Sequence, residues 1–163
     1  MPASRVTPLL CLAAIGLADL GLAAMPADAA PDQVFPTPSG TFIDLAPPAG
    51  QGPVRLAVAQ VVRIGRLQGE TVIDTAAWVQ QRTTEPMESL VRRLAAAGLR
   101  LVPLTDPSGQ RTWLAAERIV LIRGSEARHA EGARTALVMV GLLYTRDVAV
   151  RETVEEVMAA LAR

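Results

Sequence analysis

The 163-residue chain contains no lysine, so its 16 Lys/Arg positions are all arginine, and 16 acidic residues balance them. A formal net charge of zero removes the excess of cations with which proteins hold nucleic-acid phosphates. Cys11 is the only cysteine, which excludes an internal disulfide and a thiolate metal cage. The chain also lacks the glycine-rich loops that cradle phosphates. We therefore predict no cofactor, no metal and no nucleic-acid partner.

Aromatic residues are scarce, at 3% of the chain. They are Trp78, Trp113, Tyr144, Phe35 and Phe42. In so aromatic-poor a chain we expect Trp78, Trp113 and Tyr144 to fill the core rather than to form a stacking platform for nucleic-acid bases.

The N-terminus has the pattern of a secretory signal peptide over residues 1–29. A positive residue precedes an apolar run from Leu9 to Ala18, and Ala27-Asp28-Ala29 fits a small-residue cleavage site. The run is too short for a spanning helix, so no stable membrane span is expected after processing. The sequence thus predicts a periplasmic or secreted protein. The alternative is a translation start at Met25, which gives a cytoplasmic protein.

Residues 30–40 are rich in proline, and we expect a linker there. The two segments that follow, 41–96 and 97–163, resemble each other. Phe42–Gln51 aligns with Leu101–Gln110 without a gap, including a proline followed two residues later by glycine. This pair is a turn signal, because proline fixes φ and glycine supplies a positive φ.

The similarity continues in the next apolar runs. Leu56–Ile64 parallels Leu114–Ile122, and we expect each of these β-branched runs to form one strand. Each segment ends in a predicted helix with apolar residues spaced i, i+3, i+4, i+7. The two stripes are Met87, Leu90, Val91 and Leu94, and Val154, Val157, Met158 and Leu161. Thr153 and Glu156 form the pattern of a capping box.

These patterns predict an α+β fold built as a tandem duplication. Each unit is a small antiparallel sheet of four strands followed by one helix, β-β-β-β-α, occurring over residues 41–96 and again over 97–163. A lone unit of this length is marginally stable. The two copies are therefore expected to cover each other's apolar faces as a covalent pseudo-dimer.

The second segment resembles the small bacterial flagellar FlbD (SwrD-like) family. The resemblance rests on an apolar strand from Leu101, a turn ending at Gly109, the pair Trp113-Leu114, and the closing stretch Val150–Val157, VRETVEEV. Ala115 stands where the family usually has asparagine, and the leader and the duplication are foreign to it. The resemblance implies a single-unit fold, a cytoplasmic location and a non-enzymatic role linked to flagellar motor output.

No catalytic, cofactor-binding or metal-binding residues are predicted. His129 is the only histidine, and we expect it to be solvated in a loop. Ser125 shares that loop, but a triad needs a base that a third group orients. The acids Glu152, Glu155 and Glu156 stand at a helix start, where they complement the helix dipole.

Five arginines of the first segment could form a small basic face that offers a surface for a partner. The first helix carries Arg92 and Arg93 where the second has Ala159 and Ala160. The candidate partner surface comprises Arg63, Arg66, Arg82, Arg92 and Arg93. The competing interpretation is a solvated helix face.

The sequence favours a non-enzymatic adaptor or accessory protein of the bacterial envelope that is flagellum-associated and acts through protein–protein contacts. Two other classes stay open at this point. One is a cytoplasmic ligand- or nucleic-acid-binding β module, if Met25 is the start. The other is a hydrolytic enzyme with His129 as its base. The sequence identifies neither the partner nor the oligomeric state.

Overall fold

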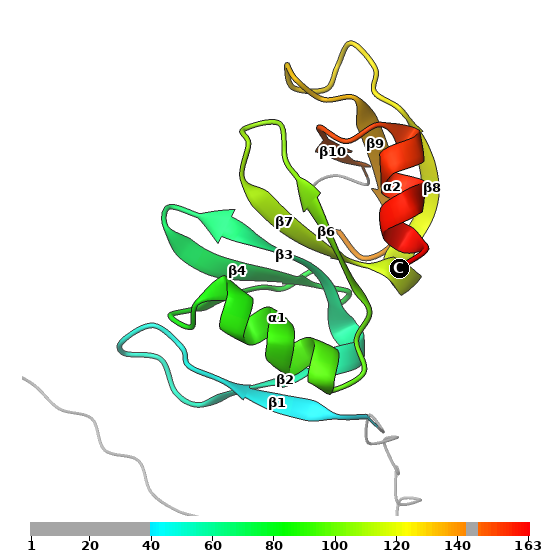
Figure 1. Cartoon of the computed structure of the whole chain (residues 1–163). Coiled ribbons are helices and arrows are strands. Elements are labelled where there is room, and N and C mark those ends of the chain that lie inside the picture. The colour runs from blue at the N-terminus through cyan, green and yellow to red at the C-terminus, as the bar shows by residue number, and fades with distance from the viewer. Residues whose placement is uncertain (1–39, 143–146) are drawn as a thin grey trace, which may run out of the picture. The chain divides into compact units, whose positions relative to one another are not determined.

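The computed structural model describes residues 40–142 and 147–163 (Figure 1). The predicted signal peptide over 1–29 lies outside the described residues, as do Tyr144 and all of the predicted linker except Gly40. The described part is a mixed α+β structure with several antiparallel sheets and two helices. Neither helix is both long enough and apolar enough to cross a membrane.

The first segment contains five strands and the second contains five more. The first runs through β1 (Phe42–Leu45), β2 (Val54–Ala57), the 3-10 turn η1 (Val58–Gln60), β3 (Val61–Leu67), β4 (Glu70–Thr75), β5 (Gln80–Thr83) and α1 (Met87–Ala96). The second runs through β6 (Leu101–Thr105), β7 (Arg111–Ala115), η2 (Ala116–Arg118), β8 (Ile119–Gly124), β9 (Thr135–Met139), β10 (Asp147–Val150) and α2 (Val154–Leu161).

The expectation of four strands per segment is therefore wrong. The run Leu56–Ile64, expected as one strand, is divided by η1, and Leu114–Ile122 is divided by η2. The division turns the chain from the first hairpin into the next sheet. Strand propensity cannot detect this corner, because the residues on both sides of it are apolar and the backbone bonds that fix it come from distant residues.

The strands of the described part form three antiparallel sheets. β1 and β2 form a separate hairpin, the largest sheet has the order β5-β4-β3-β7-β6, and the third has the order β10-β9-β8. The large sheet is shared between the segments, because Arg63 of β3 lies opposite Leu114 of β7 and Ile64 lies opposite Trp113. The hairpin of the second segment thus extends the sheet of the first.

Each segment has its own apolar core. The first gathers buried residues from β1 to β4 around α1, and the second gathers residues from β6 to β10 around α2, joined by Val62 of β3. Figure 1 shows α1 lying between the β1–β2 hairpin and the large sheet. The predicted stripe of α1 is confirmed, since Met87, Leu90, Val91 and Leu94 are all buried.

The predicted stripe of α2 is only partly right. Val157 is fully buried, but Met158 is 54% exposed. The helix has 8 residues and contacts β6 and β8, so a narrower face of it is covered. The capping box at its start is confirmed: Glu156 N–H donates to the Thr153 hydroxyl (3.1 Å), and Thr153 N–H donates to the Glu156 carboxylate (2.7 Å).

The backbone bonds that fix the corners fall at matching positions in the two segments. Each segment also has a glycine with positive φ in its first turn, Gly50 at 85° and Gly109 at 90°, and a register shift at the start of its third strand. Val58 N–H donates to Thr41 O (2.9 Å) in the first segment, as Ala116 N–H does to Arg100 O (3.0 Å) in the second. In the same way, Ala76 N–H donates to Gln60 O (2.8 Å) and Val140 N–H to Arg118 O (3.0 Å). The third pair is Thr84 N–H to Ala46 O (3.0 Å) and Arg151 N–H to Thr105 O (2.9 Å).

The chain after β9 packs tightly against the chain after β4. Gly141 has φ 96°, and a Cβ built on it lies 2.7 Å from Ala76 Cα and 3.0 Å from a Val62 methyl carbon. Both the positive φ and the lack of space require glycine here.

We expect Gly141→Ala to lower the free energy of unfolding by more than about 1 kcal/mol, since both the backbone and the packing must shift. Gly52→Ala is the matched control, because a Cβ there meets nothing within 4 Å. Urea denaturation of both variants checks the prediction. Equal stability of the two contradicts it.

The apolar side chains of the two helices should contribute differently to stability, because they differ in burial. Leu90→Ala should destabilise the protein by about 2–5 kcal/mol, since it opens a cavity in the first core. Met158→Ala should change stability by no more than about 0.5 kcal/mol, because that side chain is exposed. Thermal and chemical denaturation measure both values, and a large effect at Met158 shows that α2 is covered more fully than described.

Candidate functional site

Four of the five arginines proposed as a partner surface have carboxylate partners in their own segment. Only Arg92 forms no ion pair within the described residues. The pairs are Arg63 with Asp74 (2.6 Å), Arg66 with Glu88 (3.9 Å), Arg82 with Glu70 (2.8 Å) and Arg93 with Glu85 (2.7 Å). Much of their positive charge is thus compensated locally. The partner surface itself stays a prediction.

A cavity of about 310 Å³ lies between β3 and β4, the β6–β7 turn and β10. Its carboxylates are already engaged. Asp74 accepts from Arg63 and from Gln80 Nε2 (2.8 Å), and Asp106 accepts from the Ser108 hydroxyl (2.6 Å) within its own turn. A general base must be able to take a substrate proton within hydrogen-bond reach, and Asp74, which is tied to Arg63, is poorly suited to that task.

His129 is not solvated as expected, since its side chain is only 7% exposed. Nδ1 accepts the backbone N–H of Glu126 (2.7 Å), so the hydrogen of the neutral ring lies on Nε2. Nε2 faces Asp147, 3.5 Å from Oδ2. The expectation was wrong because Asp147, which faces Nε2, comes from β10, across a long loop and a strand.

Asp147 gathers three basic side chains, one from the end of β8 and two from the loop that follows it. Arg123 Nη2 lies 2.7 Å from Oδ2, Arg128 also donates to Oδ2, and His129 completes the group. The hydrogen bonds from Arg123 and then Arg128 lower the pKa of Asp147 to about 2. Glu126 joins the cluster, and its hydrogen bond from Arg128 lowers its pKa as well. We call Arg123, Glu126, Arg128, His129 and Asp147 the Asp147 cluster.

The Asp147 cluster ties the loop after β8 to β10. The Ser125 hydroxyl donates to Ala133 O (2.7 Å), and both His129 nitrogens face other groups, so a serine–histidine pair is not assembled. Within residues 40–142 and 147–163, no three His, Cys, Asp or Glu side chains are grouped to hold a metal ion.

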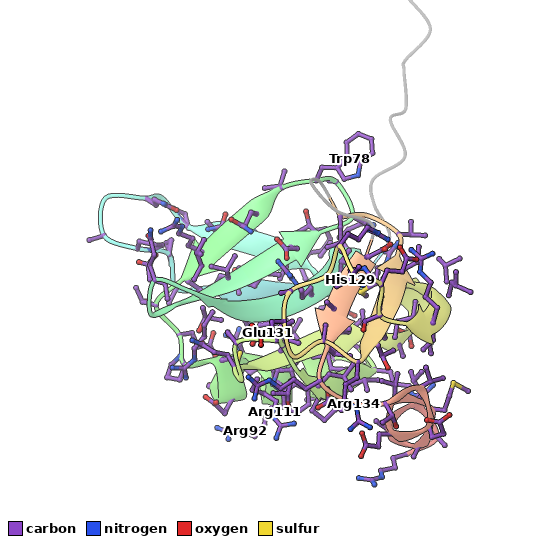
Figure 2. All side chains as sticks on the ribbon, turned by 90° about the horizontal axis from the view of Figure 1, so that it is seen from above. Trp78, Arg92, Arg111, His129, Glu131 and Arg134 are labelled. Atoms are coloured by element: carbon purple, nitrogen blue, oxygen red, sulfur yellow. The ribbon has the colours of Figure 1, made fainter. Side chains whose placement is uncertain are left out.

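The β4–β5 turn presents a feature that the sequence did not reveal. Trp78, expected in the core, is 64% exposed and has a positive φ of 62°. Figure 2 shows its ring projecting away from the ribbon, whereas Trp113 is partly buried against the first core. The one signal in the sequence was that 76–85 is the stretch in which the two segments resemble each other least.

The turn that carries Trp78 is held by Thr75. Trp78 N–H donates to Thr75 O (3.0 Å), Thr75 N–H donates to Val79 O (3.0 Å), and the Thr75 hydroxyl donates to the same oxygen (2.9 Å). Val79 beside it is 55% exposed, and Val140, next to the glycine that packs on Ala76, is 54% exposed. We call Trp78, Val79 and Val140 the Trp78 patch.

The Asp147 cluster should make the stability of the protein depend on pH in the acidic range. A carboxyl whose pKa is lowered on folding contributes stability above its unfolded pKa of 3.8, and this is lost as the pH falls toward about 2. Asp147→Asn should therefore be less stable than the parent at neutral pH, with the gap in melting temperature closing on acidification. Asp44→Asn, which removes an exposed ion pair, is the control. A gap that does not narrow contradicts the assignment.

Comparison of this chain with protein-family models, with curated proteins and with solved structures finds no match.

Proposed function

We propose that this chain is a non-enzymatic adaptor of the bacterial envelope that acts through protein–protein contacts, with the Trp78 patch as its main contact. The flagellum is its proposed setting, as the resemblance of the second segment to the FlbD family implies. The proposal depends on one observation: an exposed tryptophan is fixed in a strained backbone conformation.

The conformation of Trp78 is unfavourable for two reasons, its backbone strain and the exposure of its ring. A bulky residue at positive φ costs roughly 1–3 kcal/mol, and an exposed indole gives up the burial that would offset it. Such strain persists only where surrounding bonds determine the conformation, as those from Thr75 do here. Strained residues concentrate at binding sites, and tryptophan is enriched among the residues that dominate binding energy.

The surroundings of Trp78 suit a protein partner. Val79 and Val140 are apolar and more than half exposed, and Gly141 packs against Ala76, two residues before the tryptophan. A contiguous group of exposed apolar residues marks an interaction site more reliably than a single one does, and we propose that these three residues form such a group.

We also propose that the two segments are copies of one unit. Support comes from the common order of their elements, the three matching backbone bonds, and the register shift at the start of each third strand. Duplication followed by divergence frees one copy to acquire a contact that the other lacks. The strained β4–β5 turn belongs to the first segment, where the second has the longer connection between β9 and β10.

The test is a tagged chain purified from envelope and cytosolic fractions of the cells that express it, with captured proteins quantified. Trp78→Gly should reduce capture of the specific partner by roughly 30-fold, which corresponds to a hot spot of about 2 kcal/mol. The same variant should be at least as stable as the parent, because glycine accepts positive φ without strain.

Phe42→Ala is the matched control, since Phe42 is an aromatic residue 45% exposed on β1, away from the patch. It should leave capture unchanged. Full retention of the partner by Trp78→Gly contradicts the proposal, as does equal loss in both variants.

A further inference from the structure

The third strands of the two segments have different neighbours. The outer edge of β3 is occupied by β7, whereas β8 is an edge strand in the described structure. Val62 of β3 is fully buried, and Val120, its counterpart on β8, is 64% exposed. Leu121 beside it is 50% exposed. An edge with unpaired backbone groups and apolar side chains is a template for another strand.

The complementary strand is also present in the chain. β2 is the counterpart of β7, because both follow the first turn, both end in a 3-10 turn, and both pair with the preceding strand in the same register. β7 uses its second edge to pair with β3, but β2 belongs to a sheet of two strands and its second edge is unpaired. The chain therefore has one third strand, β8, and one second strand, β2, whose outer edges are unpaired.

The contact between the segments is thus head to tail. It joins the third strand of one segment to the second strand of the other and occurs once, because β8 and β2 of the same chain do not pair. A contact between two different surfaces that does not close on itself leaves both surfaces free at opposite ends, and it repeats when another copy is added.

We propose that β8 of one chain pairs antiparallel with β2 of a second copy of this chain, by the contact that β3 and β7 make within the chain. The register follows from Arg63 opposite Leu114 and Ile64 opposite Trp113. It places Leu121 of one copy opposite Leu56 of the next, and Ile122 opposite Arg55. Val120 becomes covered, as Val62 already is.

A second copy suits the β8 edge better than the chain's own β2 does. Leu45 and Leu56 hold the β1–β2 hairpin in the first core beside Leu90. The hairpin has to leave that core to reach β8 of its own chain. A second copy keeps its core and offers only the outer edge of β2, as β7 does while Leu114 stays in the second core.

The association should depend on concentration. Within one chain the covalent connection between α1 and β6 gives the β3–β7 contact a high effective concentration, and that advantage is missing between chains. This inference rests on the correspondence of β2 with β7 and of β3 with β8. It is independent of the Trp78 patch, so either can fail alone.

Cysteine cross-linking tests the register directly. In chains with Cys11→Ser, one chain carries Arg55→Cys and another carries Ile122→Cys, and the two are mixed under mild oxidation. Directly opposed residues of antiparallel strands have Cα atoms about 4.5–5.5 Å apart, which is within disulfide range. The mixture should give a cross-linked dimer at least tenfold more abundant than a mixture of Arg55→Cys with Met158→Cys, an exposed position on α2.

Sedimentation equilibrium supplies the second readout. The mean mass of the parent should rise above that of the monomer with increasing concentration, and Leu121→Lys should stay monomeric, because a lysine on an edge strand opposes pairing. Melting temperature confirms that Leu121→Lys is folded, and Leu67→Lys on the described surface is the control.

Three results overturn the proposal. One is a parent that stays monomeric at every concentration. Another is cross-linking in the Arg55→Cys and Ile122→Cys mixture that does not exceed the control. The third is a single chain carrying both cysteines that cross-links internally at high dilution, which shows that its own hairpin occupies β8.

Discussion

The antiparallel pairing of β3 with β7 is the contact on which the rest of the described structure depends. It makes one sheet from strands of two segments, so each core has a wall supplied partly by the other half of the sequence. Val62 enters the second core from β3, and Trp113 packs on the first from β7. Neither segment alone covers these residues, which agrees with the marginal stability expected of so short a unit.

Much of the local structure could be predicted, because it depends on nearby residues. The stripe of α1, the capping box of Thr153 and Glu156, and the turn glycines Gly50 and Gly109 all follow from spacing or residue type. The corners at η1 and η2 could not be predicted, since the residues around them suit a strand and the bonds that bend the chain come from elsewhere. Met158 was misplaced because periodicity gives the direction of a side chain but not whether anything covers it.

The candidate site was less predictable than the fold. His129 is covered by the first residue of a strand that lies beyond a loop and another strand, so its own loop gives no sign of burial. Trp78 was expected in the core on the general preference of indole for burial, and a tight turn held by Thr75 overrides that preference. For His129 a contact with a distant residue determines exposure, and for Trp78 the hydrogen bonds of its own turn do.

The close approach of Gly141 to Ala76 couples the evolution of two positions that are distant in the sequence. A side chain at 141 has no room while the backbone at 76 stays where it is, and a longer or shorter turn after β4 moves that backbone. A change of length at either turn can therefore persist in a lineage only if the other turn changes with it. Among descendants of this chain, the connections after β4 and after β9 should vary together in length, even where the strands between them drift freely.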